Sequence, residues 1–202
     1  MNVIGFEKQP LLDAKGFVTE NMIKNWKTIE DTKVENCKIF DIHRVIRKSP
    51  DTNKQGTFVY LDSSNWVNII PITKSGNIVL IKQYRHGIDE ITIEIPGGLI
   101  EAGEKPGIAG QRECTEETGY FSNESAVLLG KTTPNPAFLN NICYSYVWNN
   151  VELIQKQNLD TNEEITVFEK SLPEVKEMIL KGEINHSLVL DAFFFYFLSN
   201  GF

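Results

Sequence analysis

The sequence contains few of the features that mark secreted or membrane proteins. Its three cysteines, Cys37, Cys114 and Cys143, form no CxxC pair, which fits a reducing compartment better than a disulfide framework. The opening residues MNVIGFEKQP lack a basic segment followed by an apolar run, so we expect no secretory signal peptide. The most apolar stretch, SLVLDAFFFYFL, contains an aspartate and is too short to span a bilayer. We therefore predict a cytoplasmic protein without a membrane partner.

Positive charge is also scarce. The chain has 20 lysines and arginines against 27 aspartates and glutamates, and its formal net charge is -7. A protein that binds nucleic acid non-specifically normally carries a basic surface, so we expect no nucleic-acid partner. An anionic small-molecule substrate is still compatible with this charge, because a bound metal reverses the local field.

The pattern of β-branched and aromatic residues predicts a mixed fold. With 202 residues, of which 41% are hydrophobic, the chain can form one domain with a small appendage. Strands are expected at CKIFDIHRVIRK, GTFVYLD, WVNIIPI, NIVLIKQYR, ITIEI, SAVLLGKTT, ICYSYVW and ITVFE. Two helices are expected at LPEVKEMILKGE and HSLVLDAFFFYFL. This order predicts an α+β fold, an α/β/α sandwich around a mixed sheet. We assign residues 1–60 to an N-terminal β region and residues 61–202 to the main domain.

A further helix is predicted within EKPGIAGQRECTEETGY, from Glu104 to Tyr120. Pro106 lies near its first turn and Gly119 follows its last helical residue, which is the usual asymmetry of helix ends. Glu113, Glu116 and Glu117 are three and four residues apart, so their side chains share one face. Such crowding of like charge destabilises a helix unless cations lie among the carboxylates.

These carboxylates predict a site for a divalent cation. Carboxylate oxygens suit Mg²⁺ or Mn²⁺, and the sequence offers no cluster of cysteines or histidines for a softer metal. Arg112 can donate paired hydrogen bonds to carboxylates and hold them in place. The glycines at 97 and 98 let the backbone approach a ligand, and Gly97 offers a carbonyl oxygen. The alternative interpretation is a solvated acidic helix face.

The complete pattern resembles the Nudix box. It runs from Gly98 over five residues to Glu104, then over seven residues to Arg112-Glu113, and ends with Glu116-Glu117, Gly119 and Tyr120. The resemblance implies an α/β/α sandwich in which the box forms a loop-helix-loop. It implies that Glu113, Glu116 and Glu117, with the Gly97 carbonyl, are metal ligands, and that Glu116 and Glu117 are catalytic. Gly98, Glu104, Arg112 and Gly119 would support the box.

The flanking residues resemble the ADP-ribose pyrophosphatase branch of that family. QYRHGIDEITIEIPGG precedes the box, and Pro136 lies sixteen residues after Tyr120. The resemblance implies Mg²⁺-dependent hydrolysis of ADP-ribose to AMP and ribose 5-phosphate, with Mn²⁺ as a substitute metal. It also implies a homodimer formed through the N-terminal β region. NADH, FAD and GDP-mannose remain alternative substrates, and a non-catalytic nucleotide sensor is an alternative class.

Further candidate residues lie outside the box. Arg85 is a candidate clamp for the diphosphate, with an ion pair to Glu90 or Glu94 as the structural alternative. Glu94 would orient that arginine or touch the ribose. Glu163 and Glu164 lie in an acidic loop where this branch often supplies a general base, and the sequence does not choose between them. Pro136 and Phe138 belong to the loop PNPAFLNN, which is expected to border the substrate pocket.

Overall fold

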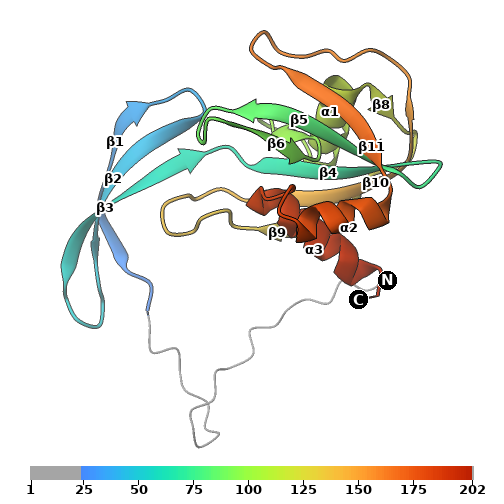
Figure 1. Cartoon of the computed structure of the whole chain (residues 1–202). Coiled ribbons are helices and arrows are strands. Elements are labelled where there is room, and N and C mark those ends of the chain that lie inside the picture. Colours follow the sequence, from blue (N-terminus) through green and yellow to red (C-terminus); the bar gives the residue numbers. More distant parts are fainter. Residues whose placement is uncertain (1–23, 202) are drawn as a thin grey trace, which may run out of the picture. The chain divides into compact units, whose positions relative to one another are not determined.

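The structure, a computed structural model, describes residues 24–201. The described chain forms two compact units (Figure 1). The first holds residues up to 37 and residues 41–60, and the second holds residues 38–40 and the chain from 61 onward. The part of the expected N-terminal β region before residue 24 lies outside the described residues.

The first unit is built around a three-stranded sheet in the order β1-β2-β3. Its strands are β1 (Lys27–Asn36), β2 (Phe40–Lys48) and β3 (Gln55–Ser63). The sequence did not predict β1, because KTIEDTKVEN lacks the alternating apolar pattern of a half-buried strand. All ten of its residues are exposed. Among the described residues of this unit, Val45 is the one fully buried hydrophobic side chain, so the sheet has almost no core of its own.

The second unit contains the mixed sheet that was predicted. Its strands are β4 (Trp66–Thr73), β5 (Ile78–Arg85), β6 (Glu90–Glu94), β7 (Gly97–Leu99), β8 (Tyr120–Phe121), β9 (Val127–Thr132), β10 (Cys143–Leu153) and β11 (Ile165–Lys170). The central path is β11-β5-β4-β10-β8, and β6, β7 and β9 pair with β5, β4 and β10. Strands β4 and β10 are parallel, while β4 and β7 are antiparallel.

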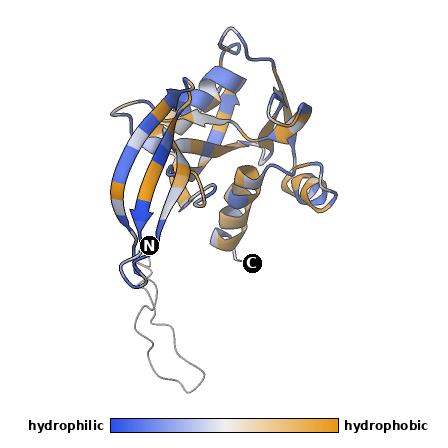
Figure 2. Ribbon diagram, turned by 90° about the vertical axis from the view of Figure 1, so that its left-hand side faces the viewer, coloured by the Kyte–Doolittle hydropathy of each residue, from blue (hydrophilic) through white to orange (hydrophobic). Residues whose placement is uncertain are grey.

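Helices cover both faces of this sheet. On one face α1 (Pro106–Thr118) buries Cys114 against Ile69 and Trp148. On the other face α2 (Leu172–Leu180) and α3 (Ser187–Ser199) pack on the sheet, with Phe193 and Val147 in one cluster. Most of α3 is hydrophobic (Figure 2), which fits its burial against strands. The prediction of an α/β/α sandwich is therefore confirmed.

The ends of α1 follow the signals in the sequence. Pro106 is its first residue, and Gly119 adopts the left-handed conformation with φ 77°. Glycine carries no Cβ and takes this conformation without strain, so it can end the helix sharply. The Gly119 N–H donates to the Thr115 carbonyl oxygen at 2.9 Å. Among residues 24–201, no helix is long and apolar enough to cross a membrane.

Candidate active site

Strand β7 brings its backbone close to β4 and to a carboxylate of α1. Gly97 pairs with Asn68 of β4, and a Cβ on Gly97 would collide with the Val67 carbonyl oxygen. A Cβ on Gly98 would lie 2.5 Å from the carboxyl carbon of Glu113. At position 97 a side chain would collide with the backbone of β4, while at position 98 it would displace the carboxylate of Glu113.

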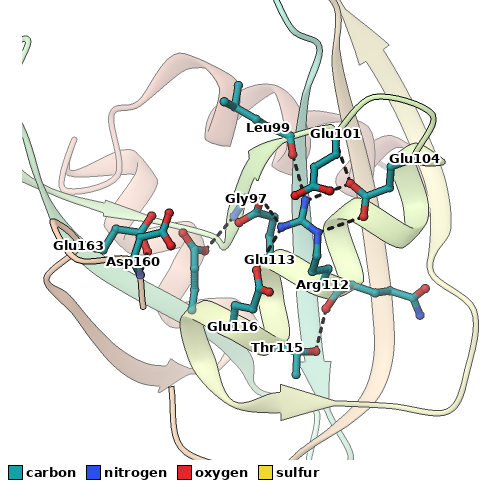
Figure 3. A network of polar contacts seen from close by, with 12 residues as sticks. Gly97, Leu99, Glu101, Glu104, Arg112, Glu113, Thr115, Glu116, Asp160 and Glu163 are labelled. Carbon is teal, nitrogen blue, oxygen red and sulfur yellow. Dashed lines mark hydrogen bonds and ion pairs between the residues drawn. The ribbon is translucent and has the colours of Figure 1, made fainter. Parts of the chain in front are cut away.

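Arg112 lies at the centre of a network of carboxylates (Figure 3). Its Nε and Nη2 donate to the two oxygens of Glu104, each at 3.0 Å. Its Nη1 donates to Glu113 at 2.9 Å and to Glu116 at 3.1 Å, and Nη2 also reaches the Leu99 carbonyl at 3.2 Å. The hydrogen bonds from Arg112 hold the pKa of Glu104 below its ordinary value. One guanidinium thus joins the loop to two of the helix carboxylates.

Glu117 is a buried carboxylate among like charges. Its residue surface is 4% exposed, and its Oε2 accepts a hydrogen bond from the Gly97 N–H at 3.0 Å. Burial raises its pKa well above the ordinary value, and the charges of Glu113 and Glu163 add to that effect. Burial also raises the pKa of Glu113. Both carboxylates therefore lack full compensation for a negative charge.

These residues fit a hard divalent cation by their chemistry. Glu113, Glu116 and Glu117 supply carboxylate oxygens from one helix, and a cation beside Glu117 would offset the charge that burial penalises. Among the described residues, no three acidic, histidine or cysteine side chains converge closely enough in this structure to hold a metal. Arg112 instead holds Glu113 and Glu116, so metal binding requires these two side chains to reorient.

Arg85 and Glu94 form a second polar group. Arg85 ends β5 and Glu94 ends β6, and the strands pair. Arg85 Nε donates to Glu94 Oε1 at 2.7 Å, and Nη2 donates to Oε2 at 2.6 Å. Burial favours the neutral form of Glu94, but the hydrogen bonds and charge of Arg85 outweigh this and lower the pKa of the carboxyl. The charge of Arg85 also acts on Glu117, which places the two groups within electrostatic reach.

The acidic loop between β10 and β11 is bonded to the end of α1. The Asn158 N–H donates to the Glu116 carbonyl at 2.8 Å, and Gln157 Nε2 donates to the Glu117 carbonyl at 2.6 Å. The charge of Glu163 acts on both Glu113 and Glu117. Glu163 and Asp160 approach the carboxylates from the side opposite Glu104 (Figure 3). Glu163 and Glu164 are both exposed, but of the two it is the charge of Glu163 that acts on Glu113 and Glu117. The choice of Glu163 as the general base stays a prediction.

Pro136 and Phe138 lie apart from this network. Both are exposed in the loop between β9 and β10. The Phe138 carbonyl accepts a hydrogen bond from the Leu61 N–H at 2.7 Å. Among the described residues, neither side chain makes a hydrogen bond or ion pair with the glutamates of α1. Their assignment to the substrate pocket stays a prediction.

Three contributors were missed from the sequence. Thr92 donates its hydroxyl to Glu94 Oε1 at 2.6 Å, and its spacing of two residues on one strand face was a usable signal. Gln157 bridges the Glu117 and Ile165 carbonyls, which no local pattern indicates. Asn68 lies opposite Gly97 in the sheet, and only the strand pairing reveals this.

Residues 65–193 match the model of the NUDIX domain. The chain belongs to the Nudix family. This match covers most of the second unit, including the box, both strands of the Arg85–Glu94 pair and the acidic loop. The predicted Nudix resemblance is therefore confirmed.

Relatives of this Nudix chain include two proteins called ADP-ribose pyrophosphatase. The one from Bacillus subtilis (strain 168) is 26% identical over 159 residues, covering 78% of this chain and 85% of the relative. The one from Saccharomyces cerevisiae is 30% identical over 187 residues, covering 83% and 78%. A methanol dehydrogenase activator from Bacillus methanolicus is 35% identical over 129 residues, covering 62% of this chain and 68% of the relative.

A solved structure supports the Nudix fold independently. A crystal structure described as an ADP compounds hydrolase superposes with a TM-score of 0.77 at 18% sequence identity. The match covers 90% of this chain and 99% of that chain. At this identity the similarity concerns the fold.

Proposed function

We propose that this Nudix chain is a Mg²⁺-dependent hydrolase that cleaves the diphosphate bond of ADP-ribose to AMP and ribose 5-phosphate. Two relatives that align with more than three quarters of the chain are called ADP-ribose pyrophosphatase. The residues that resemble that branch, QYR and EIPGG, hold the Arg85–Glu94 pair.

The observation that carries the proposal is the placement of Glu117. This carboxylate is buried, touches the Gly97 backbone and lies among the charges of Glu113, Glu163 and Arg85. A purely structural role would not need a buried acid beside two further acids. A site that binds cations and a diphosphate together explains this arrangement, because the glutamates would bind the cations and Arg85 would bind the diphosphate.

Each group of this chain has a distinct role in the proposed reaction. Glu113, Glu116 and Glu117 would hold Mg²⁺, which neutralises charge on phosphate oxygens and acidifies bound water. Arg85 offers paired N–H donors that match two phosphate oxygens. Glu163 accepts the proton of the attacking water, because its loop position allows it to reach the cluster. Arg112, itself held by Glu104, positions Glu113 and Glu116 through direct hydrogen bonds.

A hydrolysis panel with identified products tests the proposal. The purified protein is incubated with Mg²⁺ and ADP-ribose, NADH, FAD or GDP-mannose, and products are separated by ion-exchange chromatography. We expect AMP and ribose 5-phosphate from ADP-ribose, with the highest kcat/KM of the panel. A higher kcat/KM for another compound would reassign the substrate. Tight binding of ADP-ribose without cleavage in Mg²⁺ or Mn²⁺ would instead indicate a nucleotide sensor.

We also propose that the protein is a homodimer in the cytoplasm. The sheet of β1, β2 and β3 has almost no buried core of its own, although Phe58 and Val59 are large and exposed. A second copy would cover such side chains. Cys37, Cys114 and Cys143 are all free thiols, which fits a reducing compartment.

A further inference from the structure

His186 has a buried nitrogen, Nδ1, that has no hydrogen-bond partner among residues 24–201. The residue precedes α3, and its ring is one-third exposed while Nδ1 is buried. Nδ1 lies 3.6 Å from Oε2 of Glu94, which is too long for a hydrogen bond. A buried polar atom without a hydrogen bond lowers the stability of the folded state, unless it gains a partner in another state of the protein.

Glu94 is a buried carboxylate, so losing a hydrogen bond would be energetically costly for it. Its side chain is 3% exposed, and its donors are the two nitrogens of Arg85 and the hydroxyl of Thr92. Within residues 24–201, Oε2 accepts a hydrogen bond from Arg85 alone. Leaving a buried carboxylate oxygen without a donor carries the full cost of its desolvation.

Arg85 is placed to serve two partners. Its side chain is 42% exposed, in contrast to the buried Glu94. Arg85 bonds Glu94 through the Nε–Nη2 edge of its guanidinium. Turning that edge toward a diphosphate releases these hydrogen bonds to Glu94. Without a replacement donor, the cost at Glu94 would oppose that movement and weaken substrate binding.

We propose that His186 is a positioning residue that replaces Arg85 on Glu94 when Arg85 engages the diphosphate. This inference rests on the proposed function. A movement of about 0.7 Å brings Nδ1 to ordinary hydrogen-bond distance from Oε2. The ring donates through Nδ1–H, because a lone pair there would face the negative carboxylate. His186 thereby acts on the substrate through Glu94 and Arg85, without touching it.

Steady-state kinetics on the full-length protein test this role with three variants. His186→Ala removes the donor, while His186→Asn retains an N–H near the Nδ1 position and is also a favourable helix N-cap. His86→Ala is the matched control, since His86 is exposed and packs on Tyr84. We expect His186→Ala to raise KM for ADP-ribose about tenfold with kcat nearly unchanged. His186→Asn should recover most of that loss. A wild-type KM in His186→Ala would overturn the proposal. An equal rise in KM in His186→Ala and His186→Asn would also overturn it.

Imidazole NMR provides a readout that does not depend on turnover. The chain has three histidines, so ¹⁵N-histidine labelling gives few signals to assign. In Arg85→Ala without any ligand, we expect the Nδ1 signal of His186 to show a hydrogen bond that the wild type lacks. In the wild type with Mg²⁺, a methylene-bridged ADP-ribose analogue should produce the same change.

The two spectra separate this inference from the proposed function. Absence of hydrolysis and of analogue binding would overturn the function, while the ligand-free Arg85→Ala spectrum would still decide whether His186 takes the place of Arg85. An unchanged Nδ1 signal in Arg85→Ala would refute the exchange at Glu94.

Discussion

At the scale of single residues, Glu117 shows burial and charge acting against each other. The carboxylate is buried and its pKa is raised, yet its position beside the Gly97 N–H keeps one oxygen bonded. A residue that costs stability in this way is expected to matter for binding, because binding a cation recovers the cost.

Replacing Glu117 with glutamine tests this cost directly. We expect kcat/KM for ADP-ribose to fall at least about a hundredfold, because a metal ligand is lost. The rise in Tm that Mg²⁺ gives the wild type should also disappear, as measured by differential scanning calorimetry with and without Mg²⁺. Glu177→Gln changes an exposed carboxylate of α2 and should leave both quantities unchanged. Near-wild-type turnover in Glu117→Gln would show that the metal assignment is wrong.

Replacing Arg112 should change the free energy of unfolding and its dependence on Mg²⁺. Removing it in Arg112→Ala leaves Glu104, Glu113 and Glu116 without their shared donor, so we expect the free energy of unfolding to fall by about 2 kcal/mol. Added Mg²⁺ should recover part of this loss, because the released carboxylates become available to the metal. Urea unfolding with and without Mg²⁺ measures both effects. Arg44→Ala, at an exposed position of β2, is the control, and an equal loss in both variants would contradict the network.

Some of these roles are visible in the sequence because they depend on local spacing. Glu113, Glu116 and Glu117 share a face through helical spacing alone, and Arg112 lies among them for the same reason. His186 and Gln157 reach the site only through the packing of α3 and of the acidic loop. Neither lies near its partner in sequence, so no local pattern could have predicted it.

At the scale of elements, the pairing of β7 with β4 fixes where the box begins. A Cβ at position 97 would collide with the backbone of β4, and backbone cannot yield as a flexible side chain does. We expect Gly97→Ala to lower the free energy of unfolding by about 3 kcal/mol, as overpacking does. Gly87→Ala is a matched control, because a Cβ there meets no atom within 4 Å. Urea unfolding should separate the two variants, and equal stability would argue against the tight β4–β7 contact.

The start of α2 predicts a dependence on pH. Glu174 accepts hydrogen bonds from Lys170 and from Ser171, and these lower its pKa to about 2. Because the pKa of Glu174 is lower in the folded state, this carboxylate stabilises the fold at pH values above 4.5, the pKa of the unfolded chain. The contribution is lost as the pH falls from 4.5 toward about 2. An NMR titration of the Glu174 carboxyl should give this low pKa in the wild type and a higher one in Ser171→Ala. An unshifted wild-type titration would contradict the capping contacts.

Elements were predictable wherever their pattern was strong. Pro106 and Gly119 marked both ends of α1 correctly, and the alternation in ITIEI located β6. Strand β1 was missed because its stability does not come from a buried face. The two-residue β8 was missed because Tyr120 and Phe121 pair with Leu153 and Glu152, a contact that the sequence does not display.

At the scale of the whole molecule, the proposed homodimer depends on the sheet of β1, β2 and β3. Phe58 and Val59 are neighbours on β3, so their side chains point to opposite faces. One of these two faces would be covered by the second copy. We expect the charged substitution on that face, Phe58→Asp or Val59→Arg, to convert the dimer to a monomer. Sedimentation velocity at micromolar concentration measures this. A monomeric wild type would refute the dimer, whereas a dimer in both variants would place its interface elsewhere.

The backbone bonds from Gln157 and Asn158 to the last turn of α1 have a consequence for evolutionary divergence. They tie the acidic loop to the same helix turn that carries Glu116 and Glu117, so a shift of the helix carries the loop anchor with it. Between Asn158 and the start of β11 at Ile165, a segment that the structure describes in full, no hydrogen bond joins the chain to α1. Insertions and deletions that change substrate choice among descendants should therefore accumulate between residues 159 and 162, where they leave Glu116, Glu117 and the bonds to their carbonyl groups in place.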